Sequence, residues 1–123
     1  MTSGQIDYLD LSLWDCFTAP SDPAYAHAPL IDHFTSLPRG ATRLGVAGKI
    51  MDAATAQRCI DHGADFVLIG RGAILHPDFA TRAIADPAFR SVERPVTSAY
   101  LRARAIGPAF VDYLRTWKGF VAD

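Results

Sequence analysis

Two short glycine-containing segments carry the residues with the clearest potential for chemistry. Gly70-Arg71-Gly72 follows the apolar run 66–69, and Gly48-Lys49 follows the apolar, small-residue stretch 42–47. Glycines let backbone N–H groups approach a bound group closely, and a guanidinium or ammonium group adds positive charge. Phosphate is the guest that this combination suits best. The alternative for each segment is an ordinary strand-to-helix turn with a basic side chain on the surface.

The pattern around these segments predicts three strands separated by two helices. Residues 66–69 form an uninterrupted apolar run, typical of a parallel strand that is covered on both faces. Proline and glycine mark the loops and the helix ends, and Asp52 is placed to cap the second helix, with Gly63 as its left-handed stop. We expect strands at 6–13, 42–47 and 66–69, an irregular loop at 18–29, and helices at 30–37 and from Asp52 to Gly63.

The rest of the chain is predicted to be helical. A short helix at 73–75 would aim its N-terminus at the Gly70-Arg71 segment and add the partial positive charge of a helix end. Longer helices are expected at 78–86, at 97–106 with Thr97 as cap, and at 108–117, with a loop at 92–96.

The strand and helix order is that of a parallel sheet with right-handed crossovers. Because neighbouring parallel strands end side by side, Gly48-Lys49 and Gly70-Arg71 should meet at one edge of the sheet. The predicted phosphate site therefore consists of Gly48, Lys49, Gly70 and Arg71.

Composition limits the alternatives. The 123 residues are enough for a single domain, taken here as 1–123, and a net charge of -1 gives no general field for nucleic acid or an anionic membrane. Cys16 and Cys59 match no zinc or disulfide spacing, which favours a reduced, cytoplasmic setting. No secretory leader or membrane-spanning run is visible, and no metal site is expected.

A phosphate cradle after two consecutive strands, followed by a short extra helix, is typical of eight-stranded (βα) barrels. The segments 6–12, 44–50 and 63–71 resemble strands six, seven and eight of the Old Yellow Enzyme family of flavin-dependent NAD(P)H oxidoreductases. The second and third segments carry the resemblance, through their order, their spacing and the terminal Gly70-Arg71. The implied fold class is α/β, a partial (βα)8 TIM barrel covering roughly the last three βα units plus C-terminal helices.

The resemblance implies FMN as cofactor, NADH or NADPH as reductant and a small activated alkene as substrate in the complete fold. It assigns Gly48, Lys49, Gly70 and Arg71 to the FMN phosphate. The segments that hold the flavin ring, the substrate-binding histidine pair and the proton-donating tyrosine have no counterpart among these residues. We therefore expect no catalytic residue in this chain, and assign no role to its four histidines. His76, the one nearest the cradle, is expected at the surface or at a helix end.

Other possibilities stay open. The chain could act with a partner that supplies the missing strands, form a homo-oligomer, serve as a non-catalytic phosphate-binding or assembly module, or be a truncated inactive product. Other barrel enzymes, such as dihydroorotate dehydrogenase-like flavoproteins and phosphosugar isomerases, also bind phosphate at these two loops. Trp14 and Asp15 are expected to pack within their own loop without chemistry. Leu114 and Trp117 are expected to dock the last helix on the core, although the tail of some family members reaches a neighbouring subunit, for which Arg115 and Trp117 would be the relevant residues.

Overall fold

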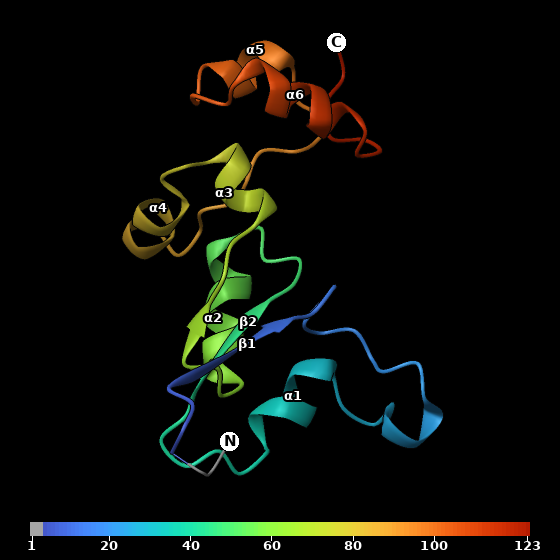
Figure 1. Cartoon of the computed structure of the whole chain (residues 1–123), viewed down its shortest axis with the longest axis vertical. Helices are drawn as coiled ribbons and strands as arrows, with labels where there is room; N and C mark the ends of the chain where they lie inside the picture. Colours follow the sequence, from blue (N-terminus) through green and yellow to red (C-terminus); the bar gives the residue numbers. More distant parts are fainter. Residues whose placement is uncertain (1–3) are drawn as a thin grey trace.

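Three parallel strands form the sheet, in the order in which they occur along the chain. In the computed structural model, which describes residues 4–123, these are β1 (Tyr8–Ser12), β2 (Arg43–Ala47) and β3 (Phe66–Val67), with β2 in the middle (Figure 1). Tyr8 lies opposite Arg43 in the β1–β2 ladder, and Gly45 lies opposite Phe66 in the β2–β3 ladder. The predicted α/β class with a small, open parallel sheet is confirmed.

The two faces of the sheet differ in their burial. Leu44 and Val46 of β2 are fully buried on the face that the first helices cover. On the opposite face Tyr8 remains 61% exposed, and the ring of Phe66 lies against Gly45, where a Cβ would come within 2.1 Å of it. The third strand is therefore shorter and more exposed than predicted: β3 has two residues, both half-buried, because only one face of this sheet is covered.

Helices α1 (Leu30–Thr35) and α2 (Ala53–Asp61) connect the strands and pack on the same face of the sheet. Ile31 of α1 and Cys59 of α2 share one buried cluster with Val46 of β2. The carboxylate of Asp52 accepts a hydrogen bond from the backbone N–H of Thr55 at 2.6 Å, which confirms its capping role. A 3₁₀ turn at Pro23–Tyr25 interrupts the loop expected at 18–29.

The extra helix after the third strand begins earlier than expected. Helix α3 (Arg71–Leu75) has Gly70 as its N-cap, so Arg71 is its first residue rather than part of a preceding loop. Helix α4 (Phe79–Ala85) follows, and Phe79 packs with Phe89 and Ala53. This second cluster ties α4 to the start of α2.

The C-terminal unit has its own core. Helices α5 (Ser98–Arg102) and α6 (Pro108–Arg115) bury Leu101, Leu114 and Phe120 together with Leu75 of α3. The hydroxyl of Tyr100 donates a hydrogen bond to the carbonyl oxygen of Leu75 at 3.0 Å. Thr97 caps α5 as predicted, but α5 is shorter than predicted and is followed by a turn in which Ala105 has a φ of 63°.

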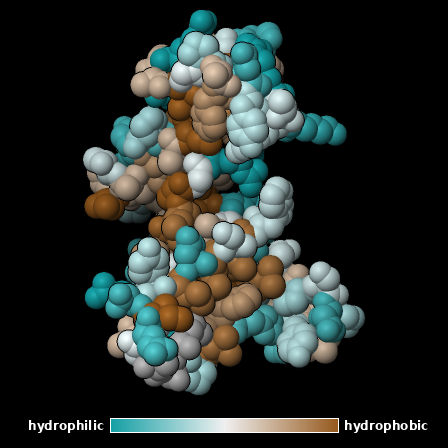
Figure 2. Space-filling view, viewed as in Figure 1, coloured by the Kyte–Doolittle hydropathy of each residue, from teal (hydrophilic) through white to brown (hydrophobic). Residues whose placement is uncertain are grey.

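The elements give the molecule an elongated outline. The sheet with α1 and α2 lies toward one end, α5 and α6 form the other end, and α3 and α4 lie between them (Figure 1). Figure 2 shows the outline narrowing between the two ends, with apolar residues gathered along the centre. Within residues 4–123 no helix combines the length and apolar character that a membrane crossing requires.

Candidate functional site

The four predicted phosphate-binding residues line one groove. Gly48 and Lys49 follow β2, while Gly70 and Arg71 lie three and four residues beyond β3 at the start of α3. The groove has a volume of about 820 Å³ and opens at the edge of the sheet where the parallel strands end. The expectation that the two segments meet at one edge is confirmed; their binding of a phosphate stays a prediction.

The loop after β2 is fixed by contacts with the loop after β1. A Cβ at position 48 would lie 2.2 Å from the carbonyl oxygen of Leu13, and the φ of Gly48 is 156°. The Gly48 carbonyl in turn accepts a hydrogen bond from the backbone N–H of Cys16 at 3.4 Å. Glycine at position 48 is thus required by packing against the neighbouring loop, and this packing holds the chain at the groove.

Gly70 differs, because no packing contact requires a glycine there. Its φ is -93°, outside the left-handed region, and a Cβ built at position 70 would have no neighbouring atom within 4 Å. The missing side chain leaves space on the groove wall where a bound group could approach the backbone. The backbone N–H groups of the first residues of α3 have no carbonyl oxygen in the preceding turn to bind, as at the N-terminus of any helix. A cradle of this kind fits an oxygen-rich anion.

The two basic side chains at the strand ends have different surroundings. The ammonium nitrogen of Lys49 lies 3.6 Å from Oδ2 of Asp15, and Lys49 has a left-handed φ of 56°. Arg71 is half-buried, makes no hydrogen bond or ion pair among residues 4–123, and has its guanidinium carbon 5.4 Å from the centroid of the Trp14 ring. The guanidinium therefore keeps its hydrogen-bonding capacity for a ligand, whereas Lys49 is partly neutralised by a carboxylate.

Trp14 departs from the packing expected within its own loop, whereas Asp15 keeps a contact within that loop and also lies near Lys49. The Trp14 side chain is 84% exposed and lines the groove. Asp15 accepts a hydrogen bond from the backbone N–H of Phe17 at 3.0 Å, which fixes its carboxylate near Lys49. The loop after β1 thus contributes an aromatic ring and a charge partner to the site.

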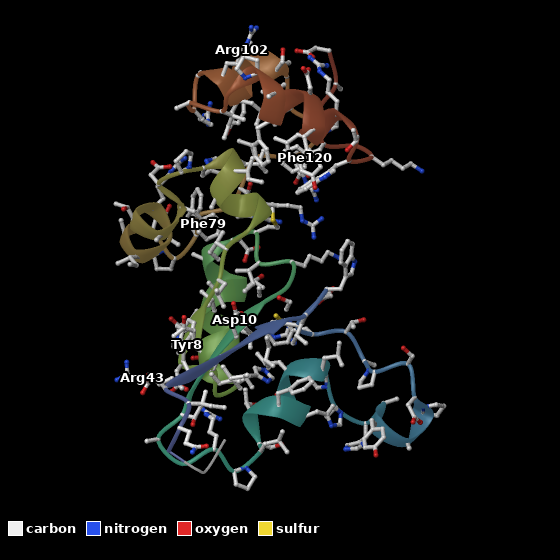
Figure 3. All side chains as sticks on the ribbon, viewed as in Figure 1. Tyr8, Asp10, Arg43, Phe79, Arg102 and Phe120 are labelled. Carbon is white, nitrogen blue, oxygen red and sulfur yellow. The ribbon has the colours of Figure 1, made fainter. Side chains whose placement is uncertain are left out.

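The opposite wall comes from the C-terminal part of the chain. Arg94, Trp117, Lys118 and Phe120 line the same groove, and the guanidinium carbon of Arg94 lies 5.7 Å from the Phe120 ring centroid. Phe120 lies on the side of the C-terminal unit that faces α3 (Figure 3). Sequence reasoning missed Arg94, Lys118 and Phe120 because the fold, not local spacing, brings them to the strand ends.

Two other residues of the tail are explained by local contacts. Leu114 is fully buried, and Trp117 packs against the same core, as expected, in addition to lining the groove. Arg115 is paired with Asp123 at 2.7 Å. Within residues 4–123 Arg115 therefore has a structural partner at the C-terminus and does not line the groove.

His76 lies in the interior rather than at the surface. It follows α3 as its C-cap residue and is only 3% exposed. Its Nε2 accepts a hydrogen bond from the backbone N–H of Val92 at 3.1 Å, and a guanidinium nitrogen of Arg82 lies 3.1 Å from Nδ1. Burial, followed by the charges of Arg82 and Arg104, lowers the pKa of His76. The histidine is a structural link between α3 and the 91–96 segment.

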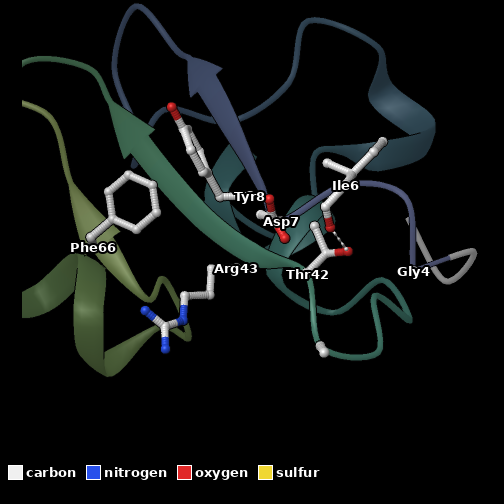
Figure 4. Close-up of a pocket in the computed structure, with 8 residues that line it drawn as sticks. Gly4, Ile6, Asp7, Tyr8, Thr42, Arg43 and Phe66 are labelled. Carbon is white, nitrogen blue, oxygen red and sulfur yellow. Dashed lines mark hydrogen bonds between the residues drawn. The ribbon is translucent and has the colours of Figure 1, made fainter.

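A second hollow lies at the other edge of the sheet, where the strands begin. It has a volume of about 580 Å³ and is lined by Ile6, Tyr8, Arg43 and Phe66 among others (Figure 4). The hydroxyl of Thr42 donates a hydrogen bond to the carbonyl oxygen of Ile6 at 3.0 Å in its wall. Arg43 is the one basic residue among the described residues that line it, and the acidic Asp7 lines it as well, whereas four basic side chains line the first groove. In parallel sheets ligands bind at the carboxyl ends of strands, which favours the first groove as the site.

The described residues show no metal centre, and both cysteines are unbridged. No cluster of three or more His, Cys, Asp or Glu side chains within residues 4–123 is placed to hold a metal ion. Cys16 and Cys59 are buried thiols, and burial raises the pKa of Cys59 to about 12. Comparison with known protein families, with curated proteins and with solved structures finds no match to this chain.

Proposed function

We propose that this chain carries the phosphate-binding end of an FMN site, in a flavin-dependent NAD(P)H oxidoreductase that resembles the Old Yellow Enzyme family. The observation that carries the proposal is the convergence of Gly48, Lys49, Gly70 and Arg71 on one groove at the carboxyl ends of two neighbouring parallel strands. Two cations and two glycines from separate loops suit a doubly charged phosphate better than a neutral ligand.

The proposed architecture is part of a (βα)8 barrel. The strands lie in chain order, and α1 and α2 pack on the same face of the sheet. A doubly wound sheet would place helices on both faces, whereas a barrel places all of them outside. The uncovered face, with Tyr8 and Phe66 in edge contact at a centroid distance of 5.8 Å, would then be the barrel interior.

The residues present fit a phosphate ester and assign no catalytic step to this chain. Gly70 leaves open space beside its backbone, and Arg71 offers an uncommitted guanidinium. When bound, FMN supplies hydride transfer, with NADH or NADPH as reductant and a small activated alkene as acceptor. The side chains described here would bind and orient the phosphate end of the cofactor, and the ring-binding and proton-donating residues would come from other parts of the complete fold.

A second candidate function is a non-catalytic phosphate-binding or assembly module. The observation that favours it is the open sheet: among residues 4–123, β1 and β3 each pair with β2 only, so each leaves one edge unpaired. Such edges accept strands from another chain. A separate chain that completes the barrel, or a homo-oligomer, would satisfy both candidate functions.

Titration of the purified chain with FMN, followed by quenching of flavin fluorescence, tests the proposal. We expect saturable binding that Arg71→Ala weakens by at least about tenfold, the loss of one charge-assisted contact. Arg102→Ala is the matched control, because Arg102 is exposed on α5 at the far end of the molecule (Figure 3). Equal FMN affinity in the two variants, or no binding by the unmodified chain, contradicts the proposal.

A further inference from the structure

We propose that His76 is a pH-sensitive latch on one wall of the groove: the neutral imidazole holds residues 92–95 against the end of α3, and protonation releases them. Arg94, which lines the groove, lies in the stretch that this latch holds. The action of the latch does not depend on which ligand the groove binds, so it is separate from the proposed function.

Two groups that can only donate hydrogen bonds face the two ring nitrogens of His76. The backbone N–H of Val92 has its nitrogen 3.1 Å from Nε2, and a guanidinium nitrogen of Arg82 lies 3.1 Å from Nδ1. A neutral imidazole has one nitrogen that accepts and one that donates, whereas an imidazolium has two donors and no acceptor. The neutral ring therefore satisfies one of the two donors, and the protonated ring satisfies neither.

The surroundings of the ring also disfavour an added positive charge. His76 is 3% exposed, and the ring of Phe89 packs edge-on against it at a centroid distance of 5.3 Å. The charged groups that act on the imidazole are Arg82 of α4 and Arg104, which follows α5, with Asp78 at the start of α4 as the opposing charge. Burial and the two guanidinium groups together lower the pKa of His76. Protonation therefore favours a movement that brings water to the ring and takes the donors away from it.

Residues 92–95 form an exposed stretch between two fixed points. On one side the backbone N–H of Ser91 donates a hydrogen bond to a backbone carbonyl at 2.9 Å, and on the other side the N–H of Val96 does the same at 3.0 Å. Between these anchors all four residues are exposed, and the bond from the Val92 N–H to His76 ties them to α3. Loss of this bond frees a short stretch of chain, while the anchors at both of its ends stay in place.

The direction of the change follows from these contacts. At neutral pH the ring is uncharged and has a nitrogen that accepts the Val92 N–H, so the latch is closed. Because the pKa of His76 is lowered from its ordinary value of 6.5, the latch opens only in acid, at a pH below 6.5.

Two-dimensional ¹H–¹⁵N NMR of the full chain from pH 8 to pH 5, with the histidine ring protons followed in parallel, tests the inference. We expect the amide signals of residues 92–94 to change along one curve, with the same midpoint as the His76 ring and below pH 6.5. The amide of Val46, in the core of β2, should stay unchanged over that step. Amide signals at 92–94 that stay constant while the His76 ring titrates overturn the inference. So does a ring that stays neutral until the whole chain unfolds in one transition.

Three variants assign the change to its cause. His76→Gln keeps an acceptor for the Val92 N–H but does not titrate, so the changes should be lost. His27→Gln is the matched control, since His27 is exposed in the loop before α1, and it should leave the changes in full. Arg82→Met removes one donor and one positive charge beside the ring, so the midpoint should move to higher pH.

Equal changes in His76→Gln and in the unmodified chain contradict the latch, as does a midpoint that Arg82→Met leaves in place. If His76→Gln does not fold, the Arg82→Met midpoint decides. No ligand is present in these measurements, so they can fail while FMN binding holds, and the FMN titration can fail while the latch holds.

Discussion

The guanidinium carbon of Arg71 lies 5.4 Å from the centroid of the Trp14 ring, within the range of a cation–π contact. The contact joins the loop after β1 to the first residue of α3, although β2 lies between β1 and β3 in the sheet. Such a contact at an exposed ring contributes about 0.5–1 kcal/mol, less than a charge-assisted hydrogen bond to phosphate. The contact with Trp14 therefore orients the Arg71 guanidinium and leaves its N–H donors available to a phosphate.

Tryptophan emission should report on the groove. The chain has two tryptophans, and both line this groove. We predict that FMN quenches the intrinsic fluorescence, and that Trp14→Phe removes a large part of the quenching while changing the free energy of unfolding by less than about 0.5 kcal/mol, because the side chain is exposed. Emission that stays constant at saturating FMN would place the flavin elsewhere.

Releasing Lys49 from its carboxylate partner should strengthen anion binding. We predict that Asp15→Asn improves phosphate affinity by roughly two- to fivefold, the equivalent of a surface ion pair of up to about 1 kcal/mol. Asparagine can still accept the hydrogen bond from the Phe17 N–H, so the loop is preserved. Asp10→Asn is the control, since Asp10 is exposed on β1 and does not line the groove; similar gains in both variants would point to net charge alone.

The two glycines of the cradle should respond differently to alanine. At position 48 a Cβ would collide with the Leu13 carbonyl, so Gly48→Ala should cost about 1–3 kcal/mol or more of unfolding free energy. At position 70 a Cβ meets no atom, so Gly70→Ala should change stability by less than about 1 kcal/mol while filling the space beside the backbone.

Denaturant unfolding together with phosphate titration separates the two effects. We expect Gly70→Ala to be folded and to bind phosphate several-fold more weakly. A Gly70→Ala variant with unchanged phosphate affinity would show that the anion does not approach this part of the backbone.

Stability should fall in mild acid because of His76. Burial, then the charges of Arg82 and Arg104, depress the pKa of this imidazole, against a smaller opposite effect from Asp78. In the unfolded chain the His76 imidazole takes up a proton near its ordinary pKa of 6.5, whereas in the folded chain it takes up the proton only at lower pH. The stabilisation that the neutral imidazole gives the folded state is therefore fully present above pH 6.5 and is lost as the pH falls toward the folded pKa. Chemical denaturation between pH 5 and 8 measures this slope.

The matched variant for this prediction is His76→Gln, which retains an acceptor for the Val92 N–H but does not titrate. Its unfolding free energy should vary less with pH than that of the unmodified chain. His76→Ala leaves that buried N–H without its partner and should cost about 1–3 kcal/mol at neutral pH. Parallel pH profiles for the Gln variant and the unmodified chain would assign the acid sensitivity to other groups.

The order of the elements could be read from local patterns. Asp52 and Thr97 cap the predicted helices, and Gly63 has the positive φ of 105° expected of a helix stop. The burial of the third strand could not be read in this way. The apolar run at 66–69 is compatible with coverage on both faces, but coverage depends on elements that pack across the sheet, and Phe66 instead lies over Gly45.

Half of the candidate site could be predicted from the sequence. Gly48-Lys49 follows β2 directly and Gly70-Arg71 lies within four residues of the end of β3, so the parallel topology brings the two segments to the same end of the sheet. The C-terminal wall depends on contacts between distant segments, such as the hydrogen bond from Tyr100 to the Leu75 carbonyl. The spacing of apolar residues in the sequence does not predict contacts between distant segments. Arg94 and Lys118 were therefore identified as groove residues only from the structure.

The central claim is that the loop after β2 and the start of α3 bind one phosphate together. Two-dimensional ¹H–¹⁵N NMR of the full chain during titration with inorganic phosphate tests it most directly. We predict that the amide signals of Gly48, Lys49, Gly70 and Arg71 shift together along one saturation curve, with amides at the other edge of the sheet, such as that of Arg43, unaffected. Shifts confined to one of the two loops, or signals that do not move at saturating phosphate, would contradict it.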